Sequence, residues 1–356
     1  MKEEDEKLKS GNEQYTKELN QKNSFGQNNY EKEEKGFAIN IPKKENKGED
    51  ADPILFCNDS IYCVGVFDGM GGSGATEYQS QNGNHTGAYI ASRRVKKTCE
   101  DFIRKVKFFE LNTEELSKKI TEELTKAKEE IGIKSSALRS SIIRTLPTTM
   151  AIVTAEKREE DILINSYWCG DSRNYILTKD GLKQISIDDL VNPQDPLENL
   201  RNDEALSNCI SQDKSFEIRC RYCGCFRDPI IIISATDGCF GYLKTPMHFE
   251  FVLLESLMKS NNCKEWENYI IKYLQPISGD DFSLSLSFIS NGSLAYWKNI
   301  LKERFNFIKE HFIHPIESIE YEIIELEDKL ENLKKDLYNE ITILWDSYKT
   351  QYMYKD

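Results

Sequence analysis

The chain has 356 residues, of which 30% are charged, and its net charge at pH 7 is −13. This acidic balance argues against a nucleic-acid partner, which requires a basic face. No apolar run approaches the roughly 18 residues of a membrane span, and the first residues lack the apolar core of a signal peptide, so we expect a soluble cytoplasmic protein with no membrane partner.

The ten cysteines are scattered, and several lie in apolar, strand-like segments. In a chain too large to need disulfide staples, this pattern favours free thiols in a reducing compartment. Cys220, Cys223 and Cys225 include a C-x-x-C, but no second pair of ligands with suitable spacing follows. We therefore interpret this cluster as part of a strand rather than as a zinc site.

The chain begins with a polar segment. Residues 1–35 are rich in Lys, Glu, Asn and Gln, and so few apolar side chains predict a flexible tail. A short alternating strand is predicted over residues 37–41 and another over residues 53–57, with a charged loop between them.

The next strand, residues 61–67, is apolar and ends abruptly at Asp68 and a cluster of glycines. In a hairpin the start of one strand lies beside the end of its partner, so Glu49 and Asp50 are predicted to approach Asp68. The glycines remove the Cβ atoms that would keep backbone carbonyls and ions away from this acid.

The glycine loop has three other interpretations. Gly69, Gly71 and Gly74 satisfy G-x-G-x-x-G, but Asp68 would place an anion beside a dinucleotide pyrophosphate. A Walker loop would need a lysine that is missing after Gly74. The third alternative is a hairpin turn with an incidental aspartate.

The rest of the chain alternates between helices and strands. A helix is predicted over residues 83–106, and a second begins at Asn112, which forms a capping-box pair with Glu115. The remaining predicted strands are 148–155, 161–169, 173–177, 216–226, 229–235 and 282–289, and the remaining helices are 248–259 and 263–274.

Acidic residues recur at the ends of these strands. Glu49, Asp68, Asp237 and Asp280 each lie at a strand terminus beside glycine or another acid. If the termini share one edge, the acids would repel one another unless hard divalent cations neutralise them. Oxygen-only ligands favour Mg²⁺ or Mn²⁺, and two such ions can activate a water for phosphoester hydrolysis. A cysteine phosphatase would need C-x-x-x-x-x-R, which is missing, and no role is assigned to the four histidines.

An ordered set of motifs resembles the type 2C (PPM-type) family of metal-dependent Ser/Thr protein phosphatases. The motifs are Gly48-Glu49-Asp50-Ala51, Val66-Phe67-Asp68-Gly69-Met70-Gly71-Gly72, Thr148-Thr149, Gly170-Asp171-Ser172-Arg173, Ala235-Thr236-Asp237-Gly238 and Gly279-Asp280-Asp281-Phe282-Ser283. The resemblance covers about residues 36–290. It implies an α+β fold, a four-layer α-β-β-α sandwich of two antiparallel sheets, with a C-terminal helical extension over residues 291–356.

The resemblance also implies roles for individual residues. Asp68 would bridge two Mn²⁺ or Mg²⁺ ions, Glu49 and the Gly69 carbonyl would complete one site, and Asp237 with Asp280 would complete the other. Asp50 would orient a metal-bound water, while Asp171 would shape the site. The implied catalytic residues are thus Asp50, Asp68 and Asp237, and the implied substrate is a phosphoserine or phosphothreonine protein.

The sequence departs from the family pattern at several positions. The arginine that often precedes the Glu-Asp pair is missing, and the segment offers Lys43, Lys44 and Lys47, of which Lys44 and Lys47 are the predicted phosphate contacts. Pro147 replaces a frequent glycine, and Gly241 stands where an optional third-metal acid would be. The alternative function is therefore a weakly active or inactive relative that binds phosphoproteins and signals through its helical tail. A nucleotide-binding protein has no supporting loop.

The C-terminal extension carries a heptad pattern. Residues 296–312 are predicted to be helical, and Pro315 is expected to break the helix. Apolar residues then recur at steps of three and four: Ile316, Ile319, Ile323, Leu326, Leu330, Leu333 and Leu337. The sequence leaves two interpretations open for the 316–346 helix, one docked on the phosphatase domain and one forming a coiled coil with a second copy or another partner.

Overall fold

The computed structural model describes residues 35–45, 47–58, 60–80, 83–105, 110–132, 143–193, 195–201, 204–289 and 293–352. Except for Lys35, the predicted polar tail lies outside the described residues.

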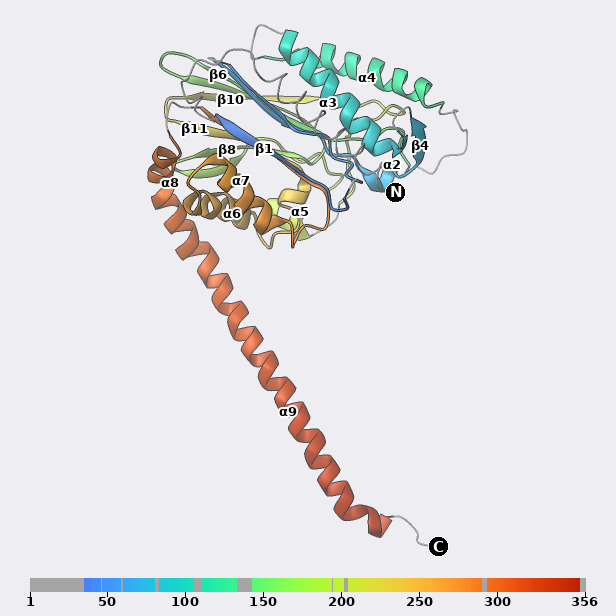
Figure 1. Ribbon diagram of the computed structural model, residues 1–356, viewed down its shortest axis with the longest axis vertical. Helices are drawn as coiled ribbons and strands as arrows, with labels where there is room; N and C mark the ends of the chain where they lie inside the picture. Colours follow the sequence, from blue (N-terminus) through green and yellow to red (C-terminus); the bar gives the residue numbers. More distant parts are fainter. Residues whose placement is uncertain are drawn as a thin grey trace, which may run out of the picture. The chain divides into compact units, whose positions relative to one another are not determined.

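Two five-stranded antiparallel sheets form the centre of the fold (Figure 1). The first has the order β1 (Gly36–Ile41), β12 (Phe282–Ile289), β11 (Ile230–Ala235), β8 (Arg173–Thr178) and β9 (Gly181–Gln184). The second has the order β10 (Arg219–Phe226), β7 (Ile162–Cys169), β6 (Met150–Lys157), β3 (Ile61–Val66) and β2 (Ile54–Cys57). A separate hairpin pairs β4 (Glu77–Ser80) with β5 (Gly83–Thr86).

Helices cover the outer face of each sheet. The helices α3 (Gly87–Lys105) and α4 (Thr113–Glu130) pack on the second sheet. The first sheet is covered by α6 (Pro246–Lys259), α7 (Cys263–Leu274) and α8 (Leu294–Ile308) (Figure 1). The shorter elements are α2 (Gly71–Gly74), α5 (Pro196–Arg201) and the 3₁₀ turn η1 (Asp237–Cys239). The expected four-layer sandwich is therefore confirmed.

Strand β11 shows why this sequence builds layers. Its side chains alternate between two buried faces: Ile231 and Ile233 pack against the helices, while Ile230 and Ile232 lie between the two sheets. A strand that is buried on both faces reads as a continuous apolar run instead of an alternating one. This explains why residues 230–235 form the most apolar strand of the chain.

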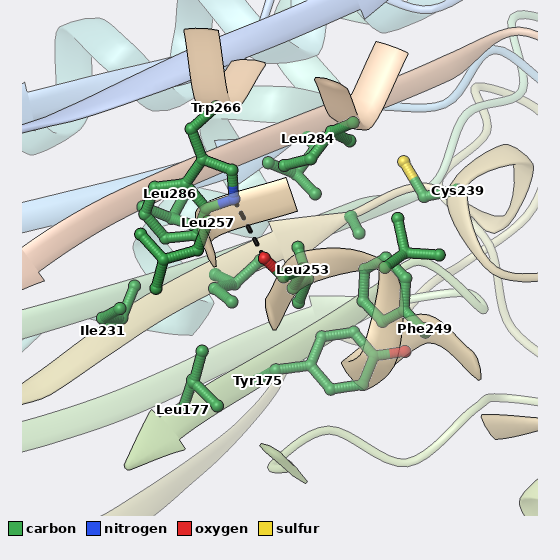
Figure 2. Packing of buried hydrophobic residues seen from close by; sticks show 14 of the residues in the cluster. Tyr175, Leu177, Ile231, Cys239, Phe249, Leu253, Leu257, Trp266, Leu284 and Leu286 are labelled. Carbon is green, nitrogen blue, oxygen red and sulfur yellow. Dashed lines mark hydrogen bonds between the residues drawn. The ribbon is translucent and has the colours of Figure 1, made fainter. Parts of the chain in front are cut away.

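The helix-covered face of the first sheet is held by a large aromatic side chain. Trp266 of α7 is fully buried, and its indole nitrogen donates a 3.0 Å hydrogen bond to the carbonyl of Leu253 in α6 (Figure 2). Figure 2 also shows Leu284 and Leu286 of β12 in the same cluster. A buried indole N–H needs such a partner, so this bond ties α7 to α6.

All ten cysteines are free thiols in the described chain. Cys220, Cys223 and Cys225 lie on β10, as the strand interpretation expected. None of the helices in the described residues combines the length and apolarity required to cross a bilayer.

One helix begins later than its sequence pattern predicted. Residues 83–86 form strand β5, and α3 begins at Gly87. Gly83, the first residue of β5, has a φ of +114°, a conformation that glycine adopts readily. The first apolar residue with helical spacing is Ala88, so the polar residues before it carry no helical period of their own.

The expectation that Pro315 breaks the C-terminal helix is wrong. Helix α8 passes into a π-helical turn, Lys309–Ile313, which continues directly into α9 (His314–Tyr352) with Pro315 as its second residue. Proline lacks an N–H and crowds the carbonyl four residues earlier. A wider π turn at that point relieves the crowding, so the chain stays helical through it.

Candidate metal centre at the strand ends

The ends of several strands meet on one edge of the sandwich. In the second sheet, Ile54 at the start of β2 pairs with Gly65 near the end of β3, and Met150 at the start of β6 pairs with Cys169 at the end of β7. In the first sheet, Ala235 at the end of β11 pairs with both Leu284 of β12 and Arg173 of β8. The loops at these ends carry the predicted acids.

The structure brings these acids together. Asp68 follows β3, and its pKa is raised well above the usual range by burial and by the charges of Asp50, Asp237, Asp171 and Asp280. Asp68 feels the charges of the other four acids, which come from segments far apart in the sequence, because they share this edge. The predicted convergence of acids is therefore present in the structure.

The Glu49–Asp50 pair is fixed by its backbone and its neighbours. The amide of Glu49 donates to the carboxylate of Asp281 at 2.5 Å, and Thr86 donates to the carboxylate of Glu49 at 2.5 Å. Asp50 is 2% exposed and accepts a 3.1 Å hydrogen bond from the hydroxyl of Thr236. These hydrogen bonds fix the backbone of Glu49 and the carboxylates of both acids.

The backbone after β3 is fixed by hydrogen bonds and by close packing. The carbonyl of Asp68 accepts from the hydroxyl of Thr148 at 2.5 Å and from the amide of Thr149 at 2.9 Å. Gly69 leaves no room for a side chain, because a Cβ there would lie 2.5 Å from the carbonyl oxygen of Glu49. The paired threonines and the first glycine of the motif therefore set the position of Asp68.

The electrostatics of the edge are dominated by burial and mutual repulsion. Burial is the largest cause of the raised pKa values of Asp237, to about 6, and of Asp50, to about 7. The pKa of Asp171 is raised to about 8, again mainly by burial and next by the charge of Asp237. The pKa values of Glu49 and Asp280 are raised for the same first reason.

Such a set fits a hard cation in its chemistry. Carboxylate oxygens are the ligands that Mg²⁺ and Mn²⁺ prefer, and a positive ion would remove the repulsion that raises these pKa values. Among the described residues, no three His, Cys, Asp or Glu side chains are arranged closely enough to form a ready group of ligands for one ion. The acids therefore match a hard cation in the chemistry of their oxygen ligands.

The predicted phosphate contacts, Lys44 and Lys47, are exposed, as is Lys43. It is Lys43 whose charge opposes the rise in the pKa of Asp280, and its ammonium group donates to the carbonyl of Gly279. The backbone amide of Lys43 also donates to Asp281 at 2.7 Å.

Sequence reasoning missed an arginine that reaches the edge from α3. The guanidinium of Arg93 donates to the carbonyls of Glu49 at 3.1 Å and Gly48 at 3.2 Å. It also lies 3.4 Å from the ring centroid of Tyr89, one helical turn earlier. The Tyr-x-x-x-Arg spacing was visible in the sequence, but which side of α3 faces this loop was not.

A cleft of about 450 Å³ opens beside Asp237 and Asp280. One wall is a buried ion pair in which Arg173 donates to Asp188 through Nε at 3.0 Å and Nη2 at 2.6 Å. The cleft is also lined by Asp171, Leu190, Asn199, Leu200, Arg201, Glu204, Phe240, Gly241 and Tyr242. Asp188 is a second residue that the motifs alone did not reveal.

No protein-family model and no curated protein matches this sequence. Among solved structures, a bacterial serine phosphatase is similar with 18% identity over 72% of this chain and 98% of that chain, with a TM-score of 0.50. A sex determining protein from C. elegans has 13% identity over 75% of this chain and 66% of that chain, with a TM-score of 0.52. The layer order and these similarities show that the chain has the type 2C (PPM-type) phosphatase fold. At such low identity the similarity concerns the fold alone.

Proposed function

We propose that the protein is a metal-dependent phosphatase that hydrolyses phosphoserine or phosphothreonine in proteins. The observation that carries this proposal is the meeting of Asp50, Asp68, Asp171, Asp237 and Asp280 at one edge of the sandwich, beside a cleft of about 450 Å³. Mutually repelling buried carboxylates are costly, and they are characteristic of sites that hold divalent cations.

The residues that would hold two Mn²⁺ or Mg²⁺ ions are Glu49, Asp68, Asp237 and Asp280, together with the carbonyl of Gly69. Ions bound there would supply a Lewis acid for the phosphoryl oxygens and lower the pKa of water. In the overall reaction a water oxygen bonds to phosphorus, the phosphorus–oxygen bond to the side chain breaks, and inorganic phosphate and the serine or threonine alcohol are released.

The chain's own groups have distinct tasks in this proposal. Asp50, held by Thr236, accepts a hydrogen bond from the attacking water and so fixes its direction. Arg93 is a positioning residue, because it holds the Gly48–Glu49 backbone through two carbonyls. The phosphorylated side chain enters the cleft, where Arg201 provides positive charge, and the charge of Lys43 acts on Asp280 at its edge. Lysine binds phosphate as a point charge instead of as a planar fork.

The proposal is tested by hydrolysis of p-nitrophenyl phosphate and of a phosphothreonine peptide. Each assay is run with Mn²⁺, with Mg²⁺ and after EDTA treatment. Asp68→Asn is compared with Asp101→Asn, which makes the same chemical change at an exposed position on α3. We expect turnover that requires the metal, falls at least about a hundredfold in Asp68→Asn, and is unchanged in Asp101→Asn.

Two outcomes would overturn this function. Equal turnover in Asp68→Asn and the wild type would show that the carboxylate edge is not the active site. A wild type that binds Mn²⁺ but turns over neither substrate would favour the alternative, a phosphatase-fold protein that binds phosphoproteins without hydrolysing them. The missing arginine before Glu49 and the exposed Lys44 and Lys47 are the features that support that alternative.

A further inference from the structure

Helix α9 exposes a continuous apolar seam. Its 39 residues include no buried residue, and more than half of the large exposed apolar side chains of the described chain lie on it. Ile319 is 61% exposed, Leu326 56% and Leu333 65%. The seam comprises Ile316, Ile319, Ile323, Leu326, Leu330, Leu333 and Leu337. Apolar surface of this extent marks a contact with another protein surface.

We propose that the seam binds α9 of a second copy of this chain in an antiparallel coiled coil. This inference is independent of the proposed enzymatic activity. The spacing assigns the inward heptad positions a and d to the seam residues. The flanking e positions are then Glu320, Glu327 and Lys334, and the flanking g positions are Glu322, Lys329 and Asp336.

The flanking charges disfavour a parallel pair. In a parallel in-register coiled coil, each g residue faces the e residue five positions later in the partner. Glu322 would then face the partner's Glu327, and Lys329 would face the partner's Lys334. Both contacts bring like charges together, which destabilises that orientation.

In an antiparallel pair, e faces e and g faces g, and one register makes the charges complementary. When Leu330 packs against the partner's Leu333, Glu327 faces the partner's Lys334 and Lys329 faces the partner's Asp336. Each of these contacts occurs twice by symmetry. The register also pairs Leu326 with the partner's Leu337, so the central layers of the seam are apolar.

Neighbouring antiparallel registers are unfavourable. A shift of one heptad in one direction brings Glu327 opposite the partner's Glu327 and Lys329 opposite the partner's Lys329. The shift in the other direction brings Lys334 opposite the partner's Lys334 and Asp336 opposite the partner's Asp336. The complementary register is therefore flanked by registers with like charges in contact.

The complementary register also uses the full length of the helix. Its centre falls within two residues of the midpoint of α9, so the two helices overlap from end to end over about 55 Å. Beyond Leu337 the seam takes an extra four-residue step to Ile341 and continues at Leu344, a stutter that locally unwinds a coiled coil. In this register Leu344 faces the partner's Ile319, which adds one more apolar layer towards each end.

A single charge reversal distinguishes the orientations. In the antiparallel pair Lys334→Glu places two acids opposite each other twice, so we expect the dissociation constant of the dimer to rise about tenfold. In a parallel pair the same change would create an attraction to Lys329 and tighten the dimer. The matched control is Lys335→Glu. It makes the same change at the neighbouring residue, which is at heptad position f and faces away from the partner helix.

Sedimentation equilibrium of the full chain, wild type and variants, over a range of concentrations gives these constants. We expect a dimer for the wild type and for Lys335→Glu, weaker association for Lys334→Glu, and recovery when Glu327→Lys is added to Lys334→Glu. A wild type that stays monomeric at about 100 µM would refute the dimer. Tighter or unchanged association in Lys334→Glu would refute the antiparallel register.

Discussion

Removing one charge from the carboxylate edge tests whether this edge is strained in the absence of cations. Asp237→Asn is the informative change, because the pKa of Asp237 is raised from 3.8 to about 6 by burial and by the charges of Asp280 and Asp50. The folded, metal-free protein therefore binds more protons than the unfolded chain between these two pH values. Its stability falls as the pH rises through that window, and the full penalty is present at pH 7.5.

The size of the penalty follows from the pKa. At about 1.4 kcal/mol per pKa unit, a rise of this size corresponds to about 3 kcal/mol for an isolated group. An amide is itself costly to bury, so we expect Asp237→Asn to raise the free energy of unfolding of the metal-free protein by about 1–3 kcal/mol. The amide can also donate a hydrogen bond to Asp68.

The assay is urea denaturation at pH 7.5, with EDTA and then with saturating Mn²⁺. In EDTA the variant should be more stable than the wild type. In Mn²⁺ the order should reverse, because the wild type gains the free energy of ion binding and the variant has lost a ligand. The control, Asp101→Asn, should match the wild type within about 0.5 kcal/mol in both conditions.

The result that would refute this reasoning is a variant that is less stable than the wild type in EDTA. That outcome would mean that the Asp237 carboxylate is stabilised by its surroundings in the metal-free protein, and that the edge needs no cation. A variant that gains as much from Mn²⁺ as the wild type would show that Asp237 does not hold the ion.

Three further changes test other parts of the structure, each followed by urea denaturation. Asp188→Asn leaves Arg173 buried without its carboxylate and should lower the free energy of unfolding by about 3–5 kcal/mol; adding Arg173→Met should cost less than the sum of the two single changes, and additivity would refute the pair. Trp266→Phe removes the hydrogen bond to Leu253 and should cost about 2 kcal/mol or more, so a neutral effect would contradict the packing described. Burial lowers the pKa of His248 from 6.5, so the free energy of unfolding of the wild type should fall as the pH drops below 6.5. His248→Gln should make this decrease smaller, and an unchanged pH profile in the variant would argue against a role of His248 in it.

Local sequence signals were reliable where a pattern is confined to one element. The cap at Asn112 accepts from the amide of Glu115 at 3.1 Å, as the capping pair predicted. Helix α7 begins at Cys263 and ends at Leu274, as its spacing indicated. Local sequence signals failed where the surrounding structure determines the outcome. Whether a proline breaks a helix depends on whether the preceding turn can widen, and before Pro315 the turn is widened.

The candidate site shows the same division. Asp68 and Asp237 could be singled out from the sequence, because a buried strand followed by an acid and glycine is a local pattern. Arg93 and Asp188 could not be singled out, because their neighbours in the sequence do not indicate which loop each side chain contacts. The two long-range contacts, Arg93 to the Glu49 backbone and Asp188 to Arg173, join different layers or loops of the fold.

By itself, the sequence determined the alternation of strands and helices, the acids at strand ends and the heptad seam of α9, because each depends on the spacing of residues along a single element. Only the tertiary structure decided that the acids share one edge, that their pKa values rise, and that a cleft opens beside them. Those properties depend on distances between segments remote in the chain, and such distances are set when the two sheets pack face to face.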